Sequence, residues 1–156
     1  MATAWRIAVE ARSYHCDDMT GAGAKDTGGR WNDKGTAIVY SSPNIGLAVL
    51  ETLVHIGTHS LPLNRYLIRI DIPDEVFNEA TEIARPPVGW DAQPAGLTSI
   101  EVGETWVRSG VSAILRVPSV IVPEELNILI NPAHPDAKRC KATRVRRFIY
   151  DDRLRS

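Results

Sequence analysis

The sequence GGRWNDKGTAIVYSSPNIGLAVLETLVHIG, residues 28–57, predicts a buried strand followed by an amphipathic helix. Residues 36–40 are rich in β-branched and aromatic side chains, which favour strands. Between residues 43 and 56 the apolar side chains form one continuous arc at the helical spacing of about 100° per residue. We expect Ser42 to cap this helix, with Pro43 in its first turn and Gly57 at its end.

The rest of the chain adds short strands and one more helix. Residues 21–32 are glycine-rich and polar, which indicates an irregular loop. A helix is expected from Thr98 to Arg108, ended by Gly110. Further strands are expected at residues 4–9, 65–72, 113–117, 120–122, 127–130 and 147–150. These elements predict an α+β fold, a mixed and mostly antiparallel sheet with packed helices, as a single domain over residues 1–156.

The composition excludes several classes of protein. With 156 residues, 44% hydrophobic and 24% charged, the chain can bury a core without disulfides or metals. A formal net charge of −1 excludes a basic footprint over the whole domain. No apolar run is long enough for a membrane span, and charged residues interrupt the N-terminal apolar stretch. We therefore expect a cytoplasmic protein.

The cysteines and histidines do not form a metal-binding pattern. Cys16 and Cys140 are far apart in the sequence, and two unpaired thiols are the simplest interpretation. His55 and His59 have helical ligand spacing, but His59 follows Gly57, where the helix is expected to end. No metal is predicted.

The glycine-flanked pair Arg30 and Trp31 is a candidate binding feature. Arginine offers a planar fork for phosphate or carboxylate, and tryptophan can stack on a flat heterocycle. The alternative is a turn with a solvated arginine and a core tryptophan. The glycine spacing is not that of a Walker A loop, and GAGAKDTGG precedes no obvious helix, so neither a P-loop nor a Rossmann site is favoured.

Tyr40, at the end of the predicted strand, and Glu51, on the predicted helix, are candidate catalytic residues. Cleavage of an N-glycosidic bond builds positive charge on the ribose, and a fixed carboxylate stabilises that charge. The alternative for Glu51 is a solvated helix residue paired with His55. Ser119 and Asn131 are further candidates, although both stand beside prolines, where turn residues are common.

Residues 138–147 carry six of the basic side chains. Stacking aromatic residues are not interleaved with them, and aspartates flank the segment. A solvated surface is the simplest interpretation, and a partner surface or a phosphate-binding surface is the alternative.

Together these segments resemble the RES-domain family, named for an Arg, a Glu and a Ser. The resemblance rests on residues 28–57, on the Pro118-Ser119 step, on NILINPAHPD and on RRFIYDDRL, and it spans nearly the whole chain. It implies that Arg30 is the family Arg, Glu51 the Glu and Tyr40 the pocket tyrosine. Ser119 would be the family Ser, with Ser109 and Ser112 as nearby alternatives.

The resemblance also implies a function. RES proteins are toxins of bacterial toxin–antitoxin pairs, usually neutralised by an antitoxin with an Xre-like helix-turn-helix. Their fold resembles that of ADP-ribosyltransferase toxins. They consume NAD by phosphorolysis or hydrolysis, and some modify a protein. We therefore expect an enzyme with NAD as substrate and an antitoxin as partner; direct binding of nucleic acid is not expected. A non-catalytic module that binds nucleic acid or a partner through residues 138–147 is the alternative from another class.

The predicted mechanism assigns a role to each candidate. Arg30 would hold the NAD pyrophosphate, and Trp31 or Tyr40 would stack on nicotinamide. Glu51 would stabilise the oxocarbenium-like transition state. Ser119 would contact phosphate or ribose, and Asn131 is a further candidate contact to NAD. All of this requires the Glu51 carboxylate and the Arg30 guanidinium to face the same cavity.

Overall fold

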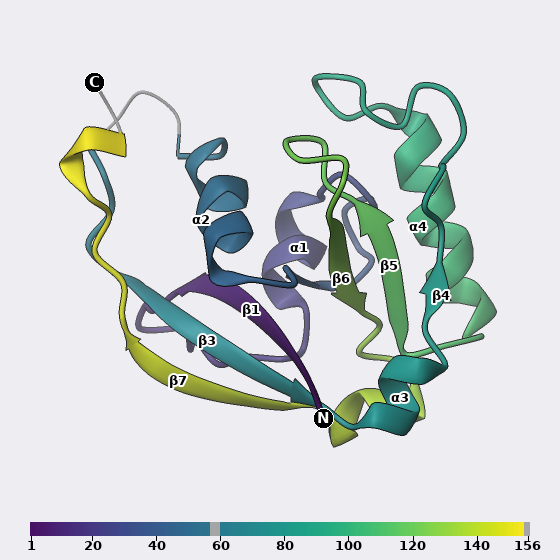
Figure 1. Cartoon of the computed structure of the whole chain (residues 1–156), viewed down its shortest axis with the longest axis horizontal. Coiled ribbons are helices and arrows are strands. Elements are labelled where there is room, and N and C mark those ends of the chain that lie inside the picture. Colours follow the sequence, from purple (N-terminus) through teal and green to yellow (C-terminus); the bar gives the residue numbers. More distant parts are fainter. Residues whose placement is uncertain (57–59, 155–156) are drawn as a thin grey trace.

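The computed structural model describes residues 1–56 and 60–154, which form strands and helices in an α+β arrangement (Figure 1). The helices are α1 (Ala22–Thr27), α2 (Ile45–Leu53), α3 (Asp74–Asn78) and α4 (Leu97–Ser109), with 3-10 turns η1 (Pro135–Arg139) and η2 (Asp152–Leu154). The strands are β1 (Ala2–Val9), β2 (Val39–Ser41), β3 (Arg65–Ile72), β4 (Thr81–Glu82), β5 (Ile114–Pro118), β6 (Leu126–Ile130) and β7 (Lys141–Arg147). The predicted fold class is confirmed.

The strands divide into two sheets rather than the single sheet expected. One is antiparallel, in the order β1-β3-β7. The other has the order β2-β6-β5-β4, and in it β4 runs parallel to β5. The predicted mixture of mostly antiparallel pairing is therefore present, but the β-structure is shared between two sheets.

The main core lies between the two sheets. Ile68, Ile70 and Ile72 of β3 pack with Ile128 and Ile130 of β6 in one buried cluster. Leu67, which points to the opposite side of β3, packs instead against α2. On the other sheet, alternate residues of β5 and β6 pack against α4. Each sheet therefore has one face in the shared core and the other covered by a helix (Figure 1).

Helix α2 begins later than the sequence predicted. The side chain of Asn44 caps it by accepting a hydrogen bond from the backbone N–H of Leu47 at 2.8 Å. Ser42 is not the cap, because its hydroxyl donates to Asn127. Pro43 precedes the helix, and Gly57, the predicted end, lies outside the described residues.

Helix α1 occupies part of the segment expected to be irregular. It starts after Gly21, whose φ of 73° favours glycine. A Cβ atom at this position would lie 2.8 Å from the backbone nitrogen of Ile38. The glycines of this segment thus permit a close backbone approach while the chain turns into a short helix.

The C-terminal half matches the predictions in part. Helix α4 ends at Gly110, as expected, with a φ of 61°. Strands β5 and β6 are present, but residues 120–122 form a turn rather than a strand. The last strand is β7, so the strand expected at residues 147–150 was placed too late. Within the described ranges no helix is long and apolar enough to cross a membrane.

Candidate active site

Arg30 lies on a tight turn that Tyr40 closes. The backbones of Gly29 and Asn32 pair across the turn, at 3.0 and 3.4 Å. The Tyr40 hydroxyl donates to Asn32 Oδ1 at 2.6 Å and accepts from the backbone N–H of Trp31 at 3.1 Å. A Cβ atom at position 29 would lie 2.8 Å from the Tyr40 hydroxyl oxygen, so glycine is required for this approach. The turn therefore presents Arg30 in a fixed position.

Helix α4 holds the same turn from the other side. A Cβ atom on Gly103 would lie 1.7 Å from the carbonyl oxygen of Trp31, so helix and turn are in direct backbone contact. The Glu104 carboxylate accepts from the Asp33 backbone N–H at 3.2 Å and from the Thr36 hydroxyl at 2.8 Å. No pattern in the sequence indicates that Gly103 and Glu104 of α4 support this turn.

The Arg30 guanidinium is bonded to a distant loop. Its Nη1 donates to the carbonyl oxygens of Trp90 and Ala92, both at 2.9 Å. Burial lowers the pKa of Arg30, while the negative charges of Glu51 and Asp91 raise it. The guanidinium thus reaches from its turn toward both the residue 90–92 loop and α2.

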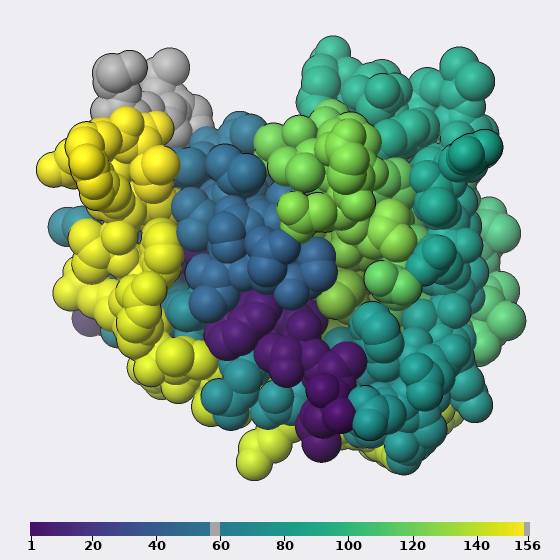
Figure 2. Space-filling view, viewed as in Figure 1, coloured from purple at the N-terminus to yellow at the C-terminus, as the bar shows by residue number. Residues whose placement is uncertain are grey.

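The Glu51 carboxylate of α2 is bonded to groups from the second sheet. Asn127 Nδ2 donates to Glu51 Oε2, and the Ser119 side chain lies near enough to lower the pKa of Glu51. Ser119 Oγ accepts from the backbone N–H groups of Ile121 and Val122, at 3.1 and 3.2 Å, which directs its own proton elsewhere. Figure 2 shows α2 and the β5–β6 region side by side on one face of the molecule.

The surroundings of Glu51 shift its pKa in both directions. Burial raises the pKa of Glu51. The hydrogen bond from Asn127, the charges of His55 and Arg30, and the nearby Ser119 side chain lower it, in that order. Among the described residues no ion pair within 4.0 Å joins Arg30 to Glu51. The two opposite charges therefore influence each other without direct contact.

Comparison with known proteins gives the family. The model of the RES domain matches residues 3–151. The chain belongs to the RES domain family. A relative from Sphingobium sp. (strain YBL2), named "Prs ADP-ribosylating toxin", is 60% identical over 153 residues, covering 96% of this chain and 94% of the relative. A relative from Yersinia enterocolitica, named "Toxin Res", is 38% identical and covers 94% of this chain and 97% of its own.

A solved structure gives the same fold. The crystal structure of the M. tuberculosis MbcT–MbcA toxin–antitoxin complex matches with a TM-score of 0.66, covering 93% of this chain and 84% of that chain. The sequence identity is 15%. This likeness bears on the RES fold alone.

Of the candidate residues of this RES domain, the structure brings together Arg30, Tyr40, Glu51 and Ser119. The other two serines lie elsewhere. Ser109 Oγ donates to the carbonyl of Trp106, and Ser112 Oγ accepts from the Trp106 indole N–H. Ser119 is therefore the serine candidate that lies near Glu51.

Trp31 and Asn131 are not placed in this group. The Trp31 side chain is 3% exposed, stacks on Trp90 with ring centroids 6.0 Å apart and belongs to the core beneath α4. Asn131 is 1% exposed; its Nδ2 donates to the Val107 carbonyl at 3.3 Å and its Oδ1 accepts from the Ala133 N–H at 3.0 Å. The geometry matches the alternative of a core tryptophan and a turn asparagine, so neither side chain enters the mechanism proposed below.

The basic segment 138–147 is largely engaged with its own chain. Arg139 pairs with Glu75 and Asp136, and Arg147 donates to the carbonyl of Leu63. Arg144 and Arg146 lie over the aromatic rings of Tyr66 and Phe148. This arrangement matches a solvated surface strand. His59 lies outside the described residues, and within them no group of three or more His, Cys, Asp or Glu could hold a metal ion.

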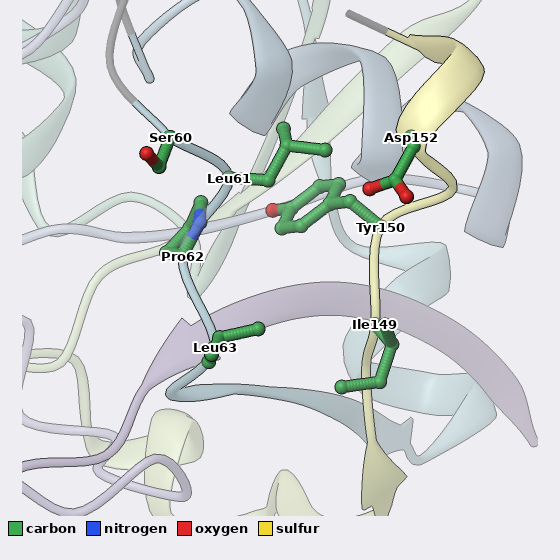
Figure 3. Close-up of a pocket in the computed structure, with 7 residues that line it drawn as sticks. All are labelled: Ser60, Leu61, Pro62, Leu63, Ile149, Tyr150 and Asp152. Carbon is green, nitrogen blue, oxygen red and sulfur yellow. The ribbon is translucent and has the colours of Figure 1, made fainter.

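One hollow of the surface lies away from the candidate site. It has a volume of about 390 Å³ and separates the Ser60–Leu63 segment from the C-terminal segment with Ile149 and Tyr150 (Figure 3). Its lining is mostly apolar, and none of the candidate site residues contributes to it. This hollow is therefore not part of the candidate site around Glu51.

Proposed function

We propose that this protein is a toxin of a toxin–antitoxin pair that cleaves the bond between nicotinamide and ribose in NAD. The observation that carries the proposal is the half-buried Glu51 carboxylate, which accepts a hydrogen bond from Asn127 and lies near Arg30 and Ser119 without forming an ion pair. A fixed negative charge close to a positive charge with which it forms no ion pair is suited to a substrate that carries pyrophosphate at one point and develops a cation at another. The toxin names of the RES relatives agree with this function.

Arg30 would bind the NAD pyrophosphate. Its hydrogen bonds to Trp90 and Ala92 both use Nη1, so in the described part of the chain Nε and Nη2 are left to donate. A guanidinium can bind phosphate oxygens through two parallel hydrogen bonds. Partial burial strengthens such bonds because the local dielectric is lower than in water.

Glu51 would stabilise the transition state. As the nicotinamide–ribose bond breaks, positive charge spreads over C1′ and O4′ of the ribose, and a nearby carboxylate lowers the barrier electrostatically. Nicotinamide leaves as a neutral molecule, so its departure needs no general acid. Asn127, Arg30 and Ser119 all favour the ionised form of Glu51 that this role requires.

Tyr40 would position the other groups rather than react. Its hydroxyl donates to Asn32 and accepts from Trp31, and burial raises the pKa of Tyr40, so the phenol stays protonated. With Trp31 in the core, Tyr40 is the aromatic residue of the group that remains a candidate for stacking on nicotinamide. Ser119 would contact the ribose or a phosphate.

The acceptor of the ADP-ribosyl group is phosphate, water or a protein side chain. All three share the cleavage step. The relative that is 60% identical is named an ADP-ribosylating toxin, which favours a protein acceptor. The partner that neutralises the present protein would be an antitoxin with an Xre-like helix-turn-helix. The structural neighbour is likewise a toxin crystallised with an antitoxin.

One experiment tests the reaction and the acceptor together. Purified protein is mixed with NAD labelled in the adenosine half, and free nicotinamide is measured in three arms: buffer alone, added phosphate, and a bacterial protein extract. We expect nicotinamide release in at least one arm, and the labelled product identifies the acceptor. Release in none of the arms by a correctly folded protein contradicts the proposed function.

A further inference from the structure

We propose that Asn127 is a positioning residue for the Glu51 carboxylate and that Ser42 fixes the orientation of the Asn127 amide. This inference deepens the proposed function and rests on it, because it assigns to Glu51 the charge that stabilises the transition state. Neither residue is a catalytic residue in this scheme, since both act through Glu51.

The hydrogen bonds around Asn127 permit one orientation of its amide. Asn127, on β6, is 8% exposed; its Nδ2 donates to Glu51 Oε2, and its Oδ1 accepts from Ser42 Oγ at 2.8 Å. An ionised carboxylate only accepts hydrogen bonds, so it requires the NH₂ side of the amide. Ser42 supplies the donor that the carbonyl side then needs. The two contacts together satisfy both ends of a buried amide.

Ser42 is itself fixed by the first sheet. It is 3% exposed, and its backbone N–H and carbonyl pair with the carbonyl and N–H of Trp5 on β1, both at 2.8 Å. Two residues later Asn44 caps α2, the helix that carries Glu51. The series Trp5, Ser42, Asn127 and Glu51 therefore connects β1, β6 and α2 by hydrogen bonds. This connection holds the carboxylate still relative to both sheets.

The charge of Glu51 depends on these donors. The groups that face it are Arg30 from the turn after α1, His55 beyond the end of α2, Ser119 from the β5–β6 connection and Asn127 from β6. Burial disfavours ionisation of Glu51. The hydrogen bond from Asn127 is the largest of the influences that favour ionisation. Loss of Asn127 would leave the carboxylate half-buried with fewer donors. The Glu51 carboxylate would then bind a proton at a higher pH, and its orientation would be less well defined.

The variants N127A, N127D and S42A test the inference, and S41A is the matched control. Ser41 is the neighbour of Ser42 and is also buried, but its hydroxyl donates to the Ile128 carbonyl and not to Asn127. N127D keeps the shape of the side chain and brings a second carboxylate to Glu51. Nicotinamide release is measured against pH for each variant, together with thermal unfolding.

We expect N127A to lower kcat by about 10- to 100-fold at neutral pH, as for loss of a hydrogen bond to a charged group. The acid limb of its pH profile moves to higher pH. S42A moves the limb in the same direction by less, N127D moves it by more, and S41A leaves it in place. A merely structural role would lower the unfolding temperature without moving the limb.

A carbon-13 NMR titration of the Glu51 carboxyl separates this inference from the proposed function, because it needs no turnover. Its pKa should rise in N127A and S42A and stay unchanged in S41A. An unchanged Glu51 titration in N127A overturns the positioning role, even where the wild type cleaves NAD. A wild type that releases no nicotinamide, combined with the expected titrations, contradicts the proposed function instead.

Discussion

The Tyr40 hydroxyl donates to Asn32 Oδ1 at 2.6 Å, and this hydrogen bond closes the turn on which Arg30 stands. The two residues are eight positions apart; Tyr40 is in the middle of β2, and Asn32 is in the turn before this strand. Asn32 is fully buried, and its Nδ2 donates to three backbone carbonyls. Within the described residues, Asn32 Oδ1 therefore depends on the Tyr40 hydroxyl for its hydrogen bond.

Removal of the Tyr40 hydroxyl should loosen the turn. In Y40F, Asn32 Oδ1 and the Trp31 N–H both lose a partner, which typically costs about 1–3 kcal/mol of stability for a buried polar group left unpaired. We expect a lower unfolding temperature and a raised KM for NAD, because Arg30 is held less firmly. Calorimetry and nicotinamide-release kinetics measure the two effects. A Y40F protein with wild-type KM would show that the bond does not position Arg30.

Neutralising Glu51 should abolish activity and also stabilise the protein. Because burial raises the pKa of Glu51 in the folded state, folding favours the protonated carboxyl, and the ionised form destabilises the fold at neutral pH. E51Q should therefore unfold at a higher temperature than the wild type at pH 7. This advantage should vanish below the ordinary pKa of glutamate.

The activity of the same variant is expected to fall by about 10²–10³-fold, as for loss of a preorganised charge at the reaction centre. E101Q, which changes an exposed carboxylate on α4, is the matched control and should leave both quantities unchanged. Full NAD cleavage by folded E51Q would contradict the role assigned to this carboxylate.

Strand β3 shows what the sequence alone could decide. The alternation over residues 65–72 predicts both ends of β3 correctly, because each side chain must point either into the shared core or toward α2. The start of α2 could not be predicted in the same way. Ser42 and Asn44 are both residue types that cap helices, and the choice depends on Trp5 and Asn127, which are distant in the sequence.

The sequence predicts site residues best at positions where only a few residue types could perform the chemistry. Arg30, Tyr40, Glu51 and Ser119 are placed together, whereas Trp31, which could equally fill a core or stack on a ligand, lies in the core. Asn127 stands 76 positions from Glu51 and interrupts an otherwise apolar strand, which is the signal that could have drawn attention to it. Its partner could not be found without the fold.

Arg30 should bind NAD through the geometry of its guanidinium as well as through its charge. R30K keeps the positive charge but loses the planar fork, and R30A loses both. In the E51Q background, where turnover is slowed, we expect R30A to weaken NAD binding by roughly tenfold or more and R30K to fall between R30A and the parent. Titration calorimetry measures the dissociation constants. Equal affinity in all three proteins would exclude Arg30 from the binding of NAD.

The contact between Gly103 and Trp31 gives a test of how α4 supports the site. In G103A the new methyl group would overlap the Trp31 carbonyl, which is backbone and cannot move aside without displacing the Arg30 turn. Overpacking of this kind costs about 1–3 kcal/mol or more, so we expect a lower unfolding temperature and a raised KM for NAD.

G46A makes the same change in α2, where the nearest atom to the new Cβ is Asn44 Oδ1 at 3.6 Å. That control should be neutral or stabilising, by up to about 1 kcal/mol, because alanine favours helix over glycine. If G103A keeps the stability and KM of the wild type, α4 does not hold the turn in place.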